Sequence, residues 1–243
     1  SYEDYFNGYI AEVRLWNIAC SEKDIVNNMY RRLNCSNPKE GLIGYWRFEE
    51  GKHNNVYNIT SSPFIATSTL SNFKDNYPQF GLQLNGKTDY VDCGINENFK
   101  IEELEAITVE AWVKHNNPPP PAEDKNKLSG VIVNQGGSWE QNGYTLWFKD
   151  NKLRVELQND AEKIVYDTVN YKVINDKNWH HIAFTWDKKS TEVQIFIDGE
   201  IIKDKDLEIP SGLYQEKKGQ KVKSQGEKFL GSIGKPKVSL NIG

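Results

Sequence analysis

The sequence predicts an all-β protein: an antiparallel two-sheet sandwich with one short helix at about residues 21–33. Short runs in which apolar and polar residues alternate recur along the chain, and Asx-containing turns separate pairs of these runs. No strand–helix–strand rhythm interrupts them, which argues against a parallel sheet. Composition agrees, because aromatic residues make up 12% of the 243 residues and Met occurs once. Flat aromatic rings pack well on pleated sheets.

Strands are expected on both sides of the helix. In residues 9–16 the alternation indicates a half-buried strand, with Ala11, Val13 and Leu15 on one face. In residues 42–48 both alternating sets are mainly apolar. We therefore expect this second strand to be buried on both faces.

The helix has a signal at its start. Ser21 can cap the first turn, and Asp24 stands three residues later, which is the spacing of a capping box. The apolar residues of one helical face follow at a spacing of four: Ile25, Met29 and Leu33. This pattern predicts one amphipathic helix at 21–33.

The middle of the chain predicts short strands and one long surface loop. Residues 51–80, rich in Asn, Ser, Thr and Pro, are expected to form short strands within loops. Residues 81–92 predict two brief strands around an Asn-Gly turn, and residues 108–114 alternate cleanly. Residues 116–127 contain four consecutive prolines, which exclude regular strand pairing.

Two hairpins are expected in the last part of the chain. Residues 144–158 form one around an Asp-Asn turn, and residues 192–204 form the other around an Asp-Gly pair. Residues 178–187 alternate as a strand between them. The Lys-, Gln- and Gly-rich residues 214–228 are expected to be a loop, and residues 238–243 close the chain.

Several segments carry a family resemblance. They are GLIGYWRFEEG, LQLNGKTDYVDCG, ITVEAWVK, NWHHIAFTWD with VQIFIDGE, LNIG, and FNGYIAEVRLWN followed by the helix. Read together, they resemble laminin-G-like jelly-roll modules of the concanavalin A-like lectin/glucanase superfamily. The resemblance covers most of the chain and implies a sandwich fold in a recognition module.

The N-terminal block, residues 1–40, does not occupy the position that the similar segment has in the family. FNGYIAEVRLWN resembles the closing strand of the family but comes first here, directly before the segment that resembles the opening strand. Because the first and last strands of the family lie side by side, residues 1–40 can supply the closing strand and helix to a sandwich built by residues 41–243. We therefore expect residues 1–243 to form a single permuted domain whose two ends lie close together. The alternatives are a tandem-repeat fragment and a strand-swapped dimer.

Charge and hydropathy narrow the function. A formal net charge of −4 gives no broad positive field, so nucleic acid is not an expected partner. No apolar run approaches the roughly 20 residues that span a bilayer, so membrane insertion is not expected either. Because the sequence opens in mid-pattern, we expect a piece of a larger multidomain protein whose targeting signal lies outside it. The resemblance implies an extracellular or cell-surface location.

The three cysteines are expected to be mostly buried thiols. A helix between Cys20 and Cys35 holds them too far apart for a disulfide. A pairing that involves Cys93 stays open as the alternative.

The sequence predicts binding rather than catalysis. A glycoside hydrolase needs two nearby carboxylates, and neither Glu110 nor Glu156 has an acidic neighbour on its own strand face. The hairpin expected at residues 144–158 carries an aromatic ring, Trp147, and a guanidinium, Arg154, and such groups commonly bind sugars. We expect a non-catalytic module that binds a glycan or a protein partner, as a monomer or a strand-swapped dimer. A structural or adhesion spacer without its own ligand is the second hypothesis, and a glycoside hydrolase is the third.

The candidate site residues fall into two sets. The ligand-binding candidates, which combine aromatic rings, an amide, a guanidinium and a carboxylate, are Trp139, Asn142, Trp147, Arg154 and Glu156. Trp147 is expected on the strand face opposite Tyr144 and Leu146, and the alternative is that it only packs over neighbouring strands. The resemblance also implies calcium on the sandwich rim, for which the candidate ligands are Asp89 and Asp92. The alternative for Asp89 is a hydrogen bond to its own turn.

Overall fold

The computed structural model describes most of the chain. The described residues are 5–34, 39–50, 55–60, 64–68, 73–74, 81–95, 105–116, 129–136, 142–168, 174, 176–203, 206–208, 221–222, 233 and 239–243. Trp139, Cys35, Ser1, the proline-rich segment from residue 117 on and most of 214–228 therefore lie outside the described residues.

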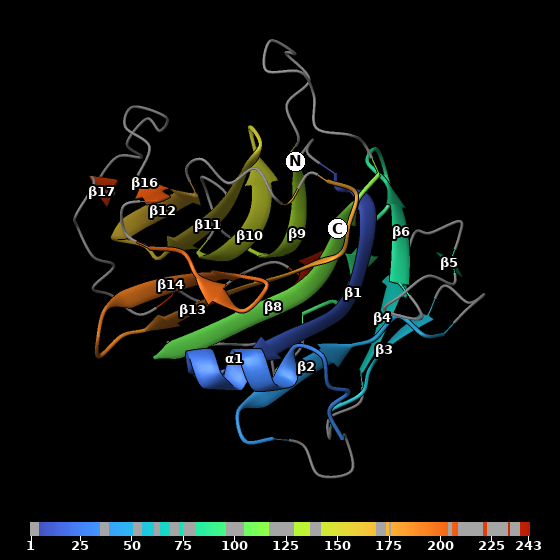
Figure 1. The fold of residues 1–243 in the computed structure, drawn as a ribbon, viewed down its shortest axis with the longest axis horizontal. Helices are drawn as coiled ribbons and strands as arrows, with labels where there is room; N and C mark the ends of the chain where they lie inside the picture. The colour runs from blue at the N-terminus through green and yellow to red at the C-terminus, as the bar shows by residue number, and fades with distance from the viewer. Residues whose placement is uncertain are drawn as a thin grey trace.

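Two sheets form the molecule (Figure 1). In spatial order, sheet A holds β16 (Leu207–Glu208), β12 (Glu162–Thr168), β11 (Lys152–Gln158), β10 (Gly143–Lys149), β9 (Gly130–Gln135), β18 (Asn241–Ile242), β7 (Val91–Asp92), β4 (Phe64–Ser68) and β3 (Asn55–Asn58), with β17 (Lys221–Val222) also paired with β12. Sheet B holds β15 (Glu200–Ile201), β14 (Glu192–Ile197), β13 (His180–Asp187), β8 (Ala106–His115), β1 (Asn7–Trp16), β6 (Gly81–Asn85) and β5 (Phe73–Lys74), with β2 (Leu42–Trp46) also paired with β1. Apart from the parallel β12–β17 pair, neighbouring strands are antiparallel, which confirms the predicted sandwich.

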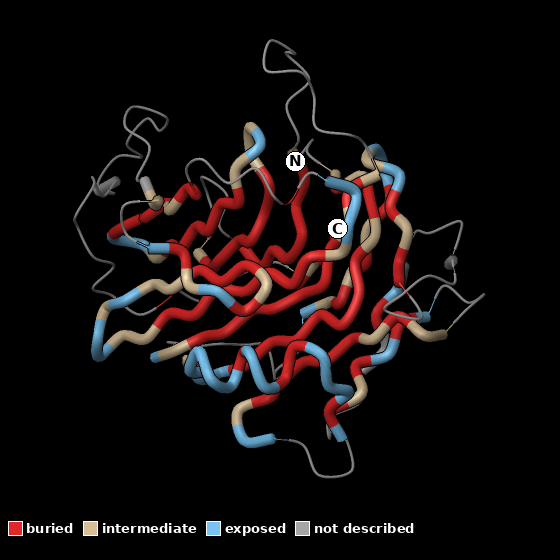
Figure 2. The backbone as a smooth tube through the Cα atoms, in the orientation of Figure 1, coloured by how far each residue is buried: buried red, intermediate tan, exposed pale blue. Residues whose placement is uncertain are grey.

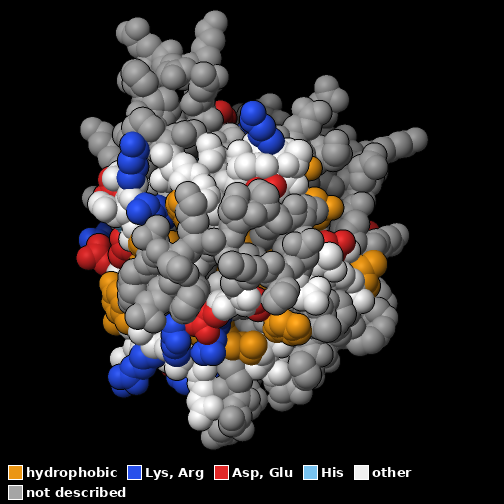
Figure 3. All heavy atoms as spheres, turned by 90° about the vertical axis from the view of Figure 1, so that its right-hand side faces the viewer, with side chains coloured by type: hydrophobic (Ala, Val, Ile, Leu, Met, Phe, Trp, Pro, Cys, Tyr) orange, Lys and Arg blue, Asp and Glu red, His pale blue; other side chains and the backbone are white. Residues whose placement is uncertain are grey.

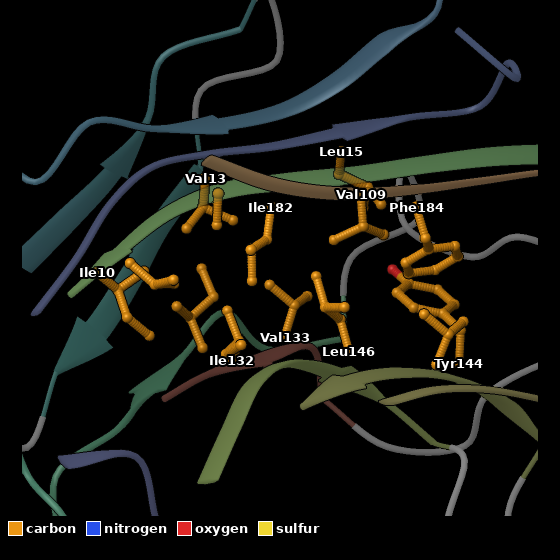
Figure 4. Close-up of a cluster of buried hydrophobic side chains, with 14 of the residues drawn as sticks. Ile10, Val13, Leu15, Val109, Ile132, Val133, Tyr144, Leu146, Ile182 and Phe184 are labelled. Carbon is orange, nitrogen blue, oxygen red and sulfur yellow. The ribbon is translucent and has the colours of Figure 1, made fainter. Parts of the chain in front are cut away.

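The main core lies between the two sheets. Figure 4 shows apolar side chains of sheet B, such as Val109 and Ile182, pointing toward Val133 and Leu146 of sheet A. The strands of both sheets are buried along most of their length (Figure 2). A second, smaller cluster lies on the opposite face of sheet B, where α1 (Glu22–Asn28) covers it. The fold therefore has two apolar clusters, one between the sheets and one between sheet B and α1.

Strand β1 is buried on both faces, so the expectation of a half-buried strand is wrong. Its faces also differ from the simple alternation: Ile10 joins Val13 and Leu15 in the main core, whereas Ala11 pairs with Trp112 on the other face. The cause is a β-bulge between Ala11 and Arg14. An extra residue in one strand moves every side chain beyond it to the other face.

Helix α1 begins as predicted but ends early. The Ser21 hydroxyl accepts the backbone N–H of Asp24, and the Asp24 carboxylate accepts the N–H of Ser21, which completes the capping box. The helix stops at Asn28 rather than near residue 33. At its end, the carbonyls of Asn28 and Met29 accept hydrogen bonds from side chains of sheet B, so these carbonyls do not require a further helical turn.

Both predicted hairpins are confirmed. Strands β10 and β11 pair across a turn in which Asp150 and Asn151 have φ of 51° and 68°. Strands β14 and β15 pair across Asp198 and Gly199, with φ of 52° and 83°. Two successive positive φ angles are typical of the type I′ turn that suits the twist of a hairpin.

The two strands expected around the Asn-Gly turn at residues 85–86 also form. However, β6 lies in sheet B and β7 in sheet A, so the two do not pair with each other. The turn therefore carries the chain from one sheet to the other.

The N-terminal block is built into the sandwich. Strand β1 pairs with β8 on one side and with β2 and β6 on the other. Phe6 reaches the main core and passes over Gly130, where a Cβ atom would lie 2.6 Å from the Phe6 Cα. Tyr5 forms a bridge with Val131, and the Gly243 N–H donates to the Ile132 carbonyl. The first and last described residues thus contact successive positions of β9, as a permuted single domain requires; the permutation itself stays a prediction.

Cys20 and Cys93 are free, buried thiols. Burial raises the pKa of the Cys20 thiol to about 12 and that of Cys93 well above its usual value. Both are therefore protonated and unreactive at neutral pH.

The molecular surface carries charges of both signs. On the side of the molecule that faces the viewer in Figure 3, described acidic and basic side chains both occur. Among the described residues, no helix has the length and apolar character needed to cross a membrane.

Candidate functional site

The outer face of sheet A, defined as the side of β9 to β12 that points away from the main core, carries three of the ligand-binding candidates, Trp147, Arg154 and Glu156. In β10, Tyr144 and Leu146 belong to the main core, so Thr145 and Trp147 point to the other side, as predicted. In β11, Val155 is a core residue, which places Arg154 and Glu156 on the same outer face.

Trp147, Arg154 and Asp167 form a row across three strands. Arg154 lies directly opposite Trp147 on β10 and Asp167 on β12. The guanidinium donates from Nε to Asp167 Oδ1 (2.5 Å) and from Nη2 to Asp167 Oδ2 (2.7 Å), which is a bidentate pair. Its Cζ also lies 5.5 Å from the Trp147 ring centroid, and the Lys149 ammonium lies 5.2 Å from the same centroid. Cations therefore hold the indole ring in place across the sheet.

A second ion pair lies beside this row. The Lys163 ammonium on β12 lies 2.7 Å from Glu156 Oε2 on β11. Both side chains are almost fully buried. The outer face of sheet A therefore holds two buried ion pairs, each with one cation and one anion.

Amide and hydroxyl groups continue the face toward one end. The Asn134 side-chain amide donates to the Thr145 hydroxyl (2.8 Å) and to the Gly136 carbonyl (2.6 Å). At the exposed rim, the Asn142 amide donates to the Asp160 carboxylate (2.8 Å). Asn134 and Thr145 therefore bond each other on the outer face of sheet A, whereas Asn142 bonds Asp160 at the exposed end of the strands.

The structure brings Trp147, Arg154 and Glu156 together but does not expose them. Their exposed fractions are 7%, 3% and 2%. Asn142 lies just before β10 and bonds Asp160, and Trp139 is outside the described residues. That these side chains bind a ligand stays a prediction.

Sheet B carries a second polar cluster, on the face that α1 covers. Glu110 on β8 accepts hydrogen bonds from the Trp16 indole (3.0 Å) and from His181 Nε2 (3.1 Å), and Arg14 Nη1 lies 3.5 Å away. Burial alone would raise the pKa of Glu110, but the bond from His181, the Arg14 charge and the Trp16 bond lower it below its usual value. Glu110 is therefore an anion at neutral pH.

This cluster holds the helical segment, α1 and the residues up to Arg31, against sheet B. Arg14 donates to the carbonyls of Asn28 (3.0 Å) and Arg31 (2.7 Å), and Trp112 donates to that of Met29 (2.9 Å). Arg14 also pairs with the Glu12 carboxylate at 3.0 Å. A cation at the carboxyl end of a helix complements the helix dipole. Sequence reasoning missed the cluster because its members are far apart in the chain, with 96 positions between Arg14 and Glu110 alone.

Comparison with known proteins places the fold in a family. A model of the concanavalin A-like lectin/glucanases superfamily, of the laminin G type, matches residues 85–237, which is more than half of the chain. The chain belongs to this superfamily. No curated protein matches it in a sequence comparison. Membership indicates a carbohydrate- or protein-binding module, and laminin G-like domains are generally non-catalytic and typically extracellular.

In this laminin G-like domain the calcium candidates Asp89 and Asp92 accept hydrogen bonds from residues of their own loops. Asp89 accepts hydrogen bonds from the backbone N–H (3.1 Å) and side-chain amide (2.8 Å) of Asn85. Asp92 accepts the N–H of Gly94 at 2.7 Å. Within the described residues, no group of three or more His, Cys, Asp or Glu side chains is placed to hold a metal ion. This geometry favours the turn-stabilising role of Asp89, and a calcium site stays a prediction.

Proposed function

We propose that this laminin G-like domain is a non-catalytic extracellular or cell-surface recognition module that belongs to a larger multidomain protein. We further propose that it binds a glycan on the outer face of sheet A. The observation that carries the proposal is the row of Trp147, Arg154 and Asp167 beside the Glu156–Lys163 pair, on a face that the main core does not need. Aromatic rings stack on the apolar faces of sugars, and amides and charged groups bond their hydroxyls.

Energetics support a role beyond packing for these side chains. Burying an ion pair costs desolvation free energy that the attraction between the charges often only offsets, and apolar residues of similar size stabilise a fold at least as well. Two buried ion pairs on one sheet face are therefore poorly explained by stability alone. Recognition of a polar ligand gives them a reason to be retained.

The same pairs count against hydrolysis. Glu156 and Asp167 are the carboxylates of the two ion pairs, and each has a cation within 2.7 Å. A glycoside hydrolase needs two carboxylates that reach the glycosidic bond, whereas these two are held in ion pairs with the protein's own cations. A hydrolase therefore ranks below a binding module.

Glycan-array binding with purified protein tests the proposal. We expect binding that falls at least tenfold in Trp147→Ala and recovers in part in Trp147→Phe, which keeps an aromatic ring. Tyr57→Ala is the matched control, because Tyr57 is an exposed aromatic residue on the distant strand β3. Thermal melting of each variant separates lost binding from lost folding.

Other outcomes identify the competing functions. Absence of binding to any glycan, together with calcium-independent melting, would favour the structural spacer. Capture of a protein ligand that survives Trp147→Ala would place recognition elsewhere on the domain. Cleavage of a glycosidic bond during incubation would overturn the non-catalytic assignment.

A further inference from the structure

Three side chains form a row across the face of sheet B that points away from the main core. Tyr9 on β1 lies directly opposite Gln83 on β6 and Lys114 on β8. Each of them has a neighbour along its strand that belongs to the main core, so the alternation of side chains points all three outward. Tyr9 lies near the start of β1, whereas α1 follows the end of this strand, so the helix does not cover Tyr9 (Figure 1).

Trp179, the residue before β13, adds a second aromatic ring to this row. Its ring centroid lies 6.2 Å from that of Tyr9, and the two ring planes are inclined at 55°. The indole also lies over Gly81 on β6, where an added Cβ atom would be 3.1 Å from one of the indole carbon atoms. Glycine at position 81 therefore lets the indole lie close to the sheet, beside Tyr9. We call Gln83, Tyr9, Lys114 and Trp179 together the Tyr9 surface.

The residues of the Tyr9 surface are accessible to a ligand. All four are partly exposed to solvent. Within the part of the chain that the structure describes, the Gln83 amide and the Lys114 ammonium have no hydrogen-bond or ion-pair partner. A ligand can therefore bond these two groups without first breaking an interaction of the protein.

The side chains of the Tyr9 surface suit an oligosaccharide. An aromatic ring packs against the apolar C–H face of a sugar, whereas an amide and an ammonium bond the oxygens of the sugar units beside it. Neighbouring strands are about 4.8 Å apart, so Gln83 and Lys114 flank Tyr9 across about 10 Å. A chain of two or more sugar units can cover this distance, whereas a single unit cannot.

We propose that the Tyr9 surface is a second glycan-binding site of this domain, which takes an oligosaccharide of at least two sugar units. One sugar ring packs against Tyr9 and Trp179, and Gln83 and Lys114 bond the oxygens on either side of it. The site goes beyond the proposed function because it lies on the other sheet and uses no residue of the outer face of sheet A.

A glycan array with the intact chain and its variants tests this site. The probes are cello-, chito- and galacturonan oligosaccharides of increasing length, each with its monosaccharide. We expect the oligosaccharides to bind at least tenfold more tightly than the monosaccharides, and Tyr9→Ala to reduce their binding at least tenfold. Tyr9→Phe keeps the ring and should retain the binding. Tyr57→Ala is the matched control, because Tyr57 is an exposed aromatic residue on β3 of the other sheet.

The two polar groups of the Tyr9 surface are tested by variants that should not disturb folding. Gln83→Ala and Lys114→Gln should leave the melting temperature unchanged, because both positions are partly exposed, and each should weaken oligosaccharide binding at least threefold. Lys23→Gln removes the same charge from an exposed position of α1 and should have no effect on binding. These variants provide the test if Tyr9→Ala fails to fold.

Amide NMR spectra locate the bound oligosaccharide directly. The signal of the Gln83 side-chain amide, assigned by its loss in Gln83→Ala, should shift when an oligosaccharide is added. The same shift should occur in Trp147→Ala, because the Tyr9 surface does not contain Trp147. A Gln83 signal that stays in place while the oligosaccharide saturates the protein would overturn the second site.

The variants also separate the two proposed sites. Binding that is lost in Trp147→Ala but unchanged in the Tyr9, Gln83 and Lys114 variants would confine recognition to sheet A and overturn the second site. Binding that is lost in the three sheet B variants but survives in Trp147→Ala would support the Tyr9 surface and overturn only the site on sheet A. Absence of binding to every probe would contradict both sites.

Discussion

The buried side chain of His115 should make the stability of the domain depend on pH. Its imidazole is 1% exposed and lies between the rings of Phe6 and Phe148, with centroid distances of 4.6 and 4.7 Å. Burial lowers the pKa of His115 from 6.5 to about 4, and the backbone of Asn7 opposes this lowering only in part. The folded protein therefore keeps the ring neutral at pH values where the unfolded chain protonates it.

The pKa difference sets the sign and the size of the effect. Because the folded-state pKa lies below the unfolded one, the stabilisation is fully present above pH 6.5 and is lost as the pH falls toward 4. At about 1.4 kcal/mol per pKa unit, the loss in free energy of unfolding amounts to about 3 kcal/mol. This is a large part of the 5–15 kcal/mol that is typical of a folded domain.

Urea unfolding of the natural chain and of His115→Phe, at pH 7.5, 5.5 and 4.0, measures this contribution. A phenylalanine ring fits a site already lined by two such rings but does not titrate. We expect the free energies of unfolding of the two proteins to diverge by about 3 kcal/mol between pH 7.5 and 4.0, in favour of the variant. Because both proteins contain the same carboxylates, the difference between their free energies of unfolding cancels the contribution of carboxylate titration. Parallel pH profiles would refute the reasoning.

Four further predictions concern other parts of the fold. Replacing Arg14 by Gln should lower the free energy of unfolding by about 3 to 5 kcal/mol, because it removes the cation that pairs with the buried Glu12 and Glu110 carboxylates, and should speed hydrogen exchange at residues 22–31. His180→Asn should reduce stability below pH 6.5 but have little effect at high pH, as urea unfolding at several pH values will show. The reason is that the Asp198 and Asp176 carboxylates raise the pKa of His180, and this stabilisation is lost as the pH rises through the raised pKa. Calcium and chelator should leave the melting temperature unchanged if Asp89 only stabilises its turn, and a rise with calcium would instead support a metal site. A circular permutant that joins the natural ends by a short linker and opens between residues 40 and 41 should fold as a monomer of similar melting temperature; aggregation or a stable dimer would contradict the single permuted domain.

The sequence predicts best where the alternation is regular and the partners are near neighbours. The β10–β11 hairpin needs only its Asp-Asn turn and its period of two, so the face on which Trp147 and Arg154 lie is read correctly. In β1 the same rule fails, because the bulge next to Glu12, whose φ is 51°, shifts the faces. Nothing in the local pattern of residues 9–16 marks this extra residue.

Burial is harder to predict than orientation. The alternation that places Glu156 on the outer face of sheet A does not tell whether that face is open to solvent. Nor does it predict that Lys163, five positions before the end of β12, pairs with Glu156. Such pairs depend on the register between strands, which becomes known only from the fold.

The two polar clusters of the sandwich differ in what they hold, and this difference bears on the proposed functional face. On sheet B, Arg14 donates to main-chain carbonyls of the helical segment, so its charge has a structural task that joins two separate elements. On sheet A, the Arg154–Asp167 pair joins β11 to β12, which backbone hydrogen bonds already join in register. A buried ion pair between strands that are already paired adds little to a fold and costs desolvation. Recognition of a ligand explains the pair on sheet A better than stability does, whereas helix docking suffices for the cluster on sheet B.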